Sequence, residues 1–150
     1  MRVILQRVSE ASVHINNKCK SNISHGLVIL LGINPNDTQE DITWLCKKIC
    51  SLRIFSDISG KMNLSLIDVC GEILLISQFT LFASTKKGNR PSFLNSATPT
   101  LAIPLYQSFI KSLETHLGKS ISTGVFGAEM KVQLINEGPV TIHLDSKNKE

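Results

Sequence analysis

Residues 26–33 read Gly-Leu-Val-Ile-Leu-Leu-Gly-Ile and form the longest apolar run in the chain. Successive side chains of a strand point to opposite faces, so a run that is apolar throughout predicts a strand buried on both faces. Residues 72–82 form a second strongly apolar run and predict another strand. The chain is therefore expected to fold around buried strands.

Shorter runs rich in β-branched residues extend this pattern toward the N-terminus. Residues 1–8, 11–15 and 18–24 predict a meander of strands, with Asn16-Asn17 as one of its turns. Residues 53–56 predict a further short strand that ends in a turn at Asp57-Ile58-Ser59-Gly60.

Two helices are predicted by their capping signals. Asp37 is followed three residues later by Glu40, which matches a capping box and predicts a helix over residues 37–50. A threonine N-cap with proline in the first turn predicts a second helix over residues 98–117.

The C-terminal part, residues 125–144, predicts two strands around residues 136–139, and Met130, Val132 and Leu134 alternate on one face. Strands at both ends of the chain flank two separated helices. This order predicts an α+β fold.

The length of 150 residues is typical of one domain. No repeat or linker divides the chain, so we expect one domain over residues 1–145 and a short, frayed tail over residues 146–150. The longest apolar run is far below the ~20 residues of a membrane span, and polar residues interrupt the N-terminus. We therefore expect no membrane contact and a cytoplasmic location.

The residues typical of metal and cofactor sites show no recognisable spacing. The four cysteines form no CxxC pair and the four histidines are scattered. Cys46 and Cys50 are four residues apart on a predicted helix, so they could either bind a metal or simply pack in the core. No phosphate-binding, dinucleotide-binding or zinc-hydrolase motif is present. We expect no cofactor and no metal.

Two segments place polar residues beside predicted apolar strands. They are Ser77-Gln78-Phe79-Thr80-Leu81 and Asn136-Glu137-Gly138-Pro139-Val140-Thr141. The first could be a solvent-facing strand end, since polar and buried residues alternate in it. The second could be an ordinary turn, although an X-Pro bond can also be cis and then redirects the preceding carbonyl.

Together these segments resemble the paired signatures of the D-aminoacyl-tRNA deacylase family. The likeness extends along nearly the whole chain and includes Gln6-Arg7-Val8, Arg53-Ile54-Phe55-Ser56-Asp57, Gly60-Lys61-Met62-Asn63 and Gly88-Asn89-Arg90-Pro91-Ser92-Phe93. The resemblance implies a β-barrel-like α+β domain of antiparallel sheets with two main helices. It also implies a homodimer in which the two signature segments meet across the subunit interface.

The activity implied by the resemblance is hydrolysis of the ester that joins a D-amino acid to tRNA, and in part of Gly-tRNA. Gly138-Pro139 would be a cis peptide that lies in the neighbouring subunit's pocket and excludes an L side chain, which is a form of chiral proofreading. Arg7 would hold this segment in place, since a guanidinium has several fixed donors for backbone carbonyls. A solvated strand arginine is the alternative.

Further residues match substrate-binding positions of the family. Phe126 and Met130 would receive the terminal adenosine of the tRNA, or would be ordinary core residues. The flanking residues of the second signature, Asn136, Val140 and Thr141, would line the same site. The basic residues Lys86, Lys87 and Arg90 would contact tRNA phosphates, or would be solvated charges. The net charge of +4 is compatible with an anionic partner.

The catalytic segment would be Ser77, Gln78, Phe79 and Thr80. Thr80 is the obvious hydroxyl nucleophile, but the sequence offers no evident base beside it. The family picture favours backbone N–H groups that polarise the ester, together with the 2′-hydroxyl of the tRNA. Two alternative functions are also compatible with the sequence: a non-catalytic nucleic-acid-binding module, and a dimeric domain whose signatures serve packing only.

Overall fold

Strand β1 (Arg2–Ile15) is the strand around which the sheet assembles in this computed structural model, which describes residues 1–149. Its first half pairs with β3 (Gly26–Gly32) and its second half with β2 (Lys18–Ile23). Strand β8 (Lys131–Asp145) pairs with β1 along both halves. All three pairings are antiparallel, so β1 is hydrogen-bonded on both edges.

The sheet continues from β3 to β6 (Glu72–Ser77) and then to β7 (Ser122–Thr123), and both of these pairings are parallel. Parallel neighbours require crossover connections, and a helix lies in each one. The sheet is therefore mixed, whereas the resemblance implied antiparallel sheets. Ser21 Oγ donates to the Thr123 carbonyl at 2.8 Å, which brings β7 beside β2 and nearly closes the barrel.

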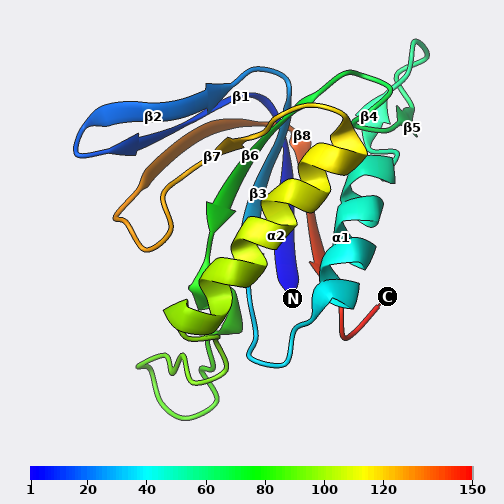
Figure 1. Cartoon of the computed structure of the whole chain (residues 1–150). Coiled ribbons are helices and arrows are strands. Elements are labelled where there is room, and N and C mark those ends of the chain that lie inside the picture. The colour runs from blue at the N-terminus through cyan, green and yellow to red at the C-terminus, as the bar shows by residue number, and fades with distance from the viewer. Residues whose placement is uncertain (150) are drawn as a thin grey trace.

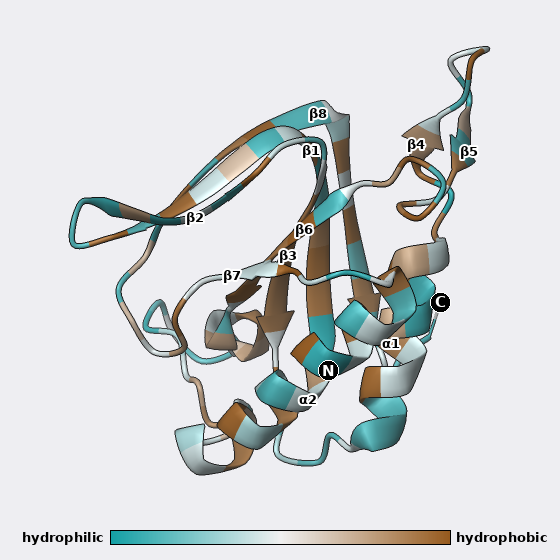
Figure 2. Ribbon diagram, turned by 45° about the horizontal axis from the view of Figure 1, so that its top comes forward, coloured by the Kyte–Doolittle hydropathy of each residue, from teal (hydrophilic) through white to brown (hydrophobic). Residues whose placement is uncertain are grey.

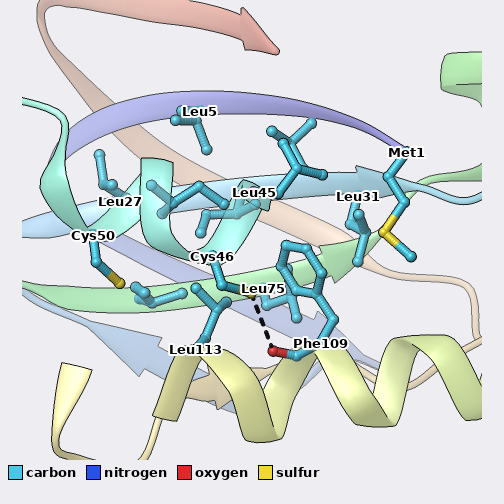
Figure 3. Packing of buried hydrophobic residues seen from close by; sticks show 14 of the residues in the cluster. Met1, Leu5, Leu27, Leu31, Leu45, Cys46, Cys50, Leu75, Phe109 and Leu113 are labelled. Carbon is cyan, nitrogen blue, oxygen red and sulfur yellow. Dashed lines mark hydrogen bonds between the residues drawn. The ribbon is translucent and has the colours of Figure 1, made fainter. Parts of the chain in front are cut away.

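Helices α1 (Gln39–Ser51) and α2 (Pro99–Leu117) lie side by side on one face of the sheet (Figure 1). Their apolar faces and the brown strands of Figure 2 enclose the larger core. Figure 3 shows α1 packed on α2 through Leu45, Phe109 and Leu113, which are fully buried. A small hairpin of β4 (Phe55–Ser56) and β5 (Met62–Leu64) projects from one end of the molecule.

A second, smaller core fills the inside of the barrel. It contains Val8, Ala11, Val13, Ile23, Val28, Leu74 and Ile76. Met130, Val132 and Leu134 pack against it, which confirms their predicted alternation on one face.

Several predicted elements are confirmed. The second helix begins at Pro99, continues past Pro104 and ends before Gly118, whose φ of +73° suits glycine. Asn16 and Asn17 form the predicted hairpin turn with φ values of +50° and +61°, a conformation that asparagine tolerates.

The predicted capping box of the first helix was one residue early. The N-cap is Thr38, and its backbone N–H donates to Asp41 Oδ2 at 2.8 Å. Asp37 instead accepts from the Asn34 N–H at 2.7 Å and pairs with the Met1 ammonium group. In both candidate pairs, Asp37 with Glu40 and Thr38 with Asp41, an acidic residue stands three positions after a residue that can cap a helix, so spacing alone could not decide between them.

Three predicted strand boundaries were also wrong. Residues 1–8 and 11–15 form the single strand β1, and the two predicted C-terminal strands form the single strand β8. The apolar run of residues 72–82 is a strand only to Ser77, after which a 3₁₀ turn, η1 (Phe79–Phe82), follows. The short strands β5 and β7 were not predicted because two or three residues show no periodicity.

The beginning of the expected tail is tied to the domain. Ser146 is buried, its N–H donates to the Met1 carbonyl at 2.9 Å, and its Oγ accepts from the Met1 ammonium at 2.7 Å. Lys147 Nζ lies 2.8 Å from Asp41 Oδ2. The last tail residue, Glu150, lies outside the described residues. Across residues 1–149, no helix has the length and hydropathy to span a membrane.

Replacing Asp41 with Asn should lower the free energy of unfolding by about 1–2 kcal/mol at neutral pH. Burial raises the pKa of Asp41, but hydrogen bonds from Lys147 and its neighbours outweigh burial and hold the pKa well below its usual 3.8. The stabilisation is therefore complete above that value and is lost as the pH falls through the lowered pKa. Urea unfolding at pH 7 and at about pH 3 measures this, and the deficit of the variant should shrink at the lower pH. A Glu40→Gln control should change little, and an equal deficit at both pH values would contradict the assignment.

Candidate functional site

The first signature segment turns away from the sheet at the end of β6. Ser77 is the last residue of β6 to pair with β3, opposite Leu31, and the Gln78 N–H donates to the Leu31 carbonyl at 2.7 Å. Gln78 has φ −141° and ψ 79°, and the chain then enters η1. Since β3 itself ends at Gly32, no strand remains for residues 79–82 to pair with in parallel.

The start of η1 presents unused backbone donors. The first N–H groups of any helical turn have no acceptor within it. The Gln78 N–H is used by β3 and the Leu81 N–H turns back to the Gln78 carbonyl at 3.3 Å. For the N–H groups of Phe79 and Thr80, no acceptor is found within residues 1–149. Two donors are thus available for a carbonyl or an oxyanion at this position.

A cavity of about 570 Å³ adjoins these residues. Ser77, Gln78 and Phe79 line it together with Phe126 and Met130. The rest of its wall is mostly apolar and includes Leu31, Ile33, Ile76, Phe93, Ala97, Ala102 and Val132. An apolar cavity of this size with a few polar groups at one wall is typical of a small-molecule or nucleoside site.

Aromatic rings stand at two places on this cavity. Phe126 packs edge to face on buried Tyr106, with ring centroids 5.6 Å apart. Phe79 and Phe93 form a second edge-to-face pair at 5.0 Å, and both rings are exposed to solvent. Such faces offer packing surfaces for a planar base.

Thr80 is exposed, and within residues 1–149 it does not line the cavity. Its Oγ1 accepts a hydrogen bond from the Gln78 side-chain amide. An amide nitrogen cannot take up a proton from the hydroxyl, and no histidine or carboxylate among the described residues contacts Thr80 Oγ1. The surroundings therefore provide no general base for this hydroxyl.

The second signature segment is a large bulge in β8. Gln6 of β1 pairs with Thr141 and Val8 pairs with Asn136, so residues 137–140 stand opposite the single residue Arg7. These four residues, called here the 137–140 loop, leave the ladder and project from the sheet. The Gly138–Pro139 peptide bond within the loop is cis.

Arg7 and Asn136 hold the 137–140 loop at its base. The Arg7 guanidinium is buried and donates to the carbonyls of Ile54 at 2.6 Å and Glu137 at 3.3 Å. The Asn136 amide donates to the carbonyls of Arg7 at 2.9 Å and Val140 at 3.0 Å. Both hydrogens of the Asn136 amide are thus used to close the bulge.

Gly138 has no room for a side chain. A Cβ there would lie 2.8 Å from Arg7 Nη2 and 2.9 Å from Val140 Cγ2, and the φ of Gly138 is +118°. This conformation and the close approach of Arg7 both require glycine. The loop therefore exposes backbone rather than side chain at this point.

Sequence reasoning gave His25 no role, yet its Nδ1 lies 3.5 Å from Glu137 Oε2. His25 begins the turn into β3, and its ring packs on Phe55 at 5.1 Å. No local spacing relates residue 25 to residue 137, because the two are brought together only by the pairing of β1 with both β3 and β8.

Within one chain the two signature segments lie beside different parts of β1: η1 is bonded at its start and the 137–140 loop near its middle. Arg2 bonds to η1, whereas Arg7 bonds to the 137–140 loop, and five residues of strand separate them by roughly 16 Å. No residue of this loop lines the cavity beside η1 in the described part of the chain. A single copy does not bring the two segments together.

The basic residues Lys86, Lys87 and Arg90 are exposed on one loop. A backbone pairing of Ser84 with Ser92, at 2.8 and 2.9 Å, closes this loop. None of the three basic side chains lines the cavity in the described chain.

The cysteines of α1 pack in the core. Burial raises the pKa of Cys46 to about 12 and that of Cys50 to about 11, so neither thiol is poised to ionise. Cys46 Sγ donates to the Phe109 carbonyl (Figure 3). Residues 1–149 contain no cluster of ligand side chains suited to a metal ion.

Comparison with known proteins gives a consistent set of similarities. A family model described as D-Tyr-tRNA(Tyr) deacylase matches residues 4–145. D-aminoacyl-tRNA deacylases of Bacteroides thetaiotaomicron and Flavobacterium psychrophilum are each 61% identical over 150 residues, which is 100% of both chains. A solved structure described as c-Myc DNA Unwinding Element Binding Protein is 40% identical, with a TM-score of 0.91 over 97% of this chain and 98% of that one. A probable eukaryotic D-amino acid tRNA deacylase shares the fold, with a TM-score of 0.82 at 17% identity over 95% of this chain and 97% of that one.

Proposed function

This chain belongs to the D-Tyr-tRNA(Tyr) deacylase family, and on that premise we propose how it performs the reaction of its relatives. The proposed substrate is tRNA that carries a D-amino acid, and the products are free tRNA and the D-amino acid. The observation that carries the proposal is the mostly apolar cavity beside η1, which is lined by Phe79; the backbone N–H groups of Phe79 and of the next residue, Thr80, have no acceptor within residues 1–149. With tRNA as its substrate, the protein would act in the cytoplasm.

The terminal adenosine of the tRNA would occupy the apolar part of this cavity. Phe126 and Met130 offer it an aromatic face and a thioether. The ester carbonyl would then lie at the N–H groups of Phe79 and Thr80, which stabilise the negative charge that develops on its oxygen during attack by water. The adjacent ribose 2′-hydroxyl of the tRNA would position or activate that water.

The 137–140 loop would act as the chiral filter. It presents the backbone of Gly138-Pro139 rather than a side chain, and Arg7 and Asn136 fix it in place. Rigid backbone near the Cα of the aminoacyl group would clash with an L side chain, while a D side chain points away. Exclusion of this kind does not depend on which side chain is carried, and glycine would partly escape it.

The filter would reach the cavity from a second copy of the chain. Within one copy η1 is bonded to the start of β1 and the loop to its middle, roughly 16 Å apart along the strand, so a site that uses both would be shared between two subunits. A two-fold dimer repeats every contact and so builds two identical sites. Lys86, Lys87 and Arg90 would contact phosphates of the bound tRNA, and this contribution should weaken with salt.

The direct test is the hydrolysis of D-Tyr-tRNA and L-Tyr-tRNA by the purified protein, with Gly-tRNA as a third substrate. We expect rapid release of D-tyrosine, slow release of L-tyrosine and intermediate release of glycine. The relative described as binding a DNA unwinding element makes nucleic-acid binding without hydrolysis the second candidate. That candidate predicts salt-sensitive binding with no ester cleavage, and a packing role alone predicts neither.

Thr80→Ala should retain single-turnover hydrolysis of D-Tyr-tRNA within about tenfold of the unmodified protein. The reason is that the proposed donors are main-chain groups, which a side-chain truncation leaves in place. Thr85→Ala, in the adjacent exposed loop, is the matched control. A loss of several orders of magnitude in the Thr80 variant alone would establish the hydroxyl as the catalytic group instead.

Arg7→Ala should lower the ratio of D-Tyr-tRNA to L-Tyr-tRNA hydrolysis by at least about tenfold, either by admitting the L substrate or by losing activity on the D substrate. The variant loses both guanidinium bonds, so the loop is no longer held against Ile54. Arg53→Ala is the control, because Arg53 also donates to a backbone carbonyl, that of Asn63, but is exposed and makes no hydrogen bond to the loop within the described chain. Unchanged activity together with unchanged rejection of L-Tyr-tRNA would disprove the role of Arg7.

A further inference from the structure

The C-terminal end of η1 is fastened to the sheet by Arg2. The Arg2 Nη1–H donates to the Leu81 carbonyl at 3.1 Å, and the guanidinium lies over the Phe82 ring, 4.6 Å from its centroid. The third contact of the same group is with Asp145, whose Oδ2 accepts from Arg2 Nε at 2.8 Å. One planar group therefore joins η1 to the end of β8.

These contacts come from a row of residues that are neighbours across three strands. Arg2 of β1 pairs with Gly32 of β3 on one side and with Asp145 of β8 on the other. Gly32 is also in contact with the turn, because a Cβ there would lie 2.9 Å from Leu81 Cβ and 3.1 Å from the Gln78 carbonyl oxygen. The η1 turn thus packs directly against the backbone of Gly32, and the Arg2 hydrogen bond holds it in this position.

Stability of the fold is a poor explanation for this arrangement. The Arg2 side chain is 38% exposed, and an ion pair that is open to solvent contributes little to folding. What these contacts do provide is a fixed position of η1 relative to β8. Arginine can bond to a carboxylate and a carbonyl at once because its donors are fixed in one plane, which lysine cannot reproduce.

We propose that Arg2 is a positioning residue that fixes η1 so that the Phe79 and Thr80 N–H groups point at the reacting ester. The proposal rests on the proposed function of these donors. Asp145 orients the Arg2 side chain, and Gly32 is the neighbour of Arg2 on β3. A positive group at the C-terminal end of a helical turn is also electrostatically favourable. Arg2 touches no part of the cavity in the described chain, so it acts through the turn rather than on the substrate.

The test compares Arg2→Met, Arg2→Lys and Asp145→Asn with Arg53→Met as the control. For Arg2→Met we expect kcat on D-Tyr-tRNA to fall by about tenfold to a hundredfold, since small displacements of catalytic donors have effects of this size. Arg2→Lys and Asp145→Asn should give smaller losses. The Kd for deacylated tRNA and the Tm should stay close to those of the unmodified protein, so the effect appears in kcat and not in KM.

Amide hydrogen exchange of the free protein gives a readout that does not depend on activity. In Arg2→Met, exchange should accelerate at the hydrogen-bonded amides of Leu81 and Ala83 and not in the 137–140 loop. If the unmodified protein does not hydrolyse D-Tyr-tRNA, the proposed function fails, whereas the exchange result still tests the fastening of η1. Unchanged kcat, unchanged exchange at the Leu81 and Ala83 amides, or full rescue by lysine would overturn the positioning role. If Arg2→Met does not fold, the Arg2→Lys and Asp145→Asn variants decide the question by the same criteria.

Discussion

The pairing of β1 on both of its edges is the constraint on which the rest of the structure depends. Residues 2–6 and 8 pair with both β3 and β8, and Arg7 pairs with β3 and stands opposite the 137–140 loop, so side chains on β1 can act on segments from both strands. Arg2 at one end reaches η1, and Arg7 nearer the middle reaches the 137–140 loop. The distance between these two functional segments is thus set by the part of β1 that runs from Arg2 to Arg7.

The proposed chemistry uses the backbone at both segments, and the side chains around them serve to hold that backbone. Arg2 and Arg7 both donate to main-chain carbonyls, and Asn136 spends both amide hydrogens on closing the loop. Such a site has an advantage for a substrate whose side chain varies, because backbone groups recognise the shared ester and Cα rather than the variable part. Catalysis by backbone groups also explains why the hydroxyl of Thr80 has no base beside it.

Much of the fold could be predicted from local signals, because those signals act over a few residues. The buried strand β3, the Asn16-Asn17 turn and the start of α2 at Pro99 each follow from periodicity or turn chemistry. The η1 turn could not be predicted, since Gln-Phe-Thr-Leu-Phe alternates as a strand would and its departure depends on where β3 ends. The contacts of Arg2 with η1 and of His25 with Glu137 could not be predicted for a related reason, because strand pairing alone brings these partners together. The two signature segments were found through resemblance, and residue patterns alone would have left them as a strand end and a turn.

If the loop of one copy completes the cavity of another, two chains with complementary defects should form a working site when they are mixed. An Ala128→Trp chain has a filled cavity but an intact loop, and an Arg7→Ala chain has an intact cavity but a loosened loop. Because the cavity of the Ala128→Trp chain is filled, all activity in a co-refolded mixture comes from cavities of the Arg7→Ala chain. We expect the selectivity for D-Tyr-tRNA over L-Tyr-tRNA to rise above that of Arg7→Ala alone, with about a quarter of the normal number of sites restored in an equal mixture. Selectivity that stays at the value of Arg7→Ala alone would show that the loop and the cavity belong to the same chain and would rule out the shared site.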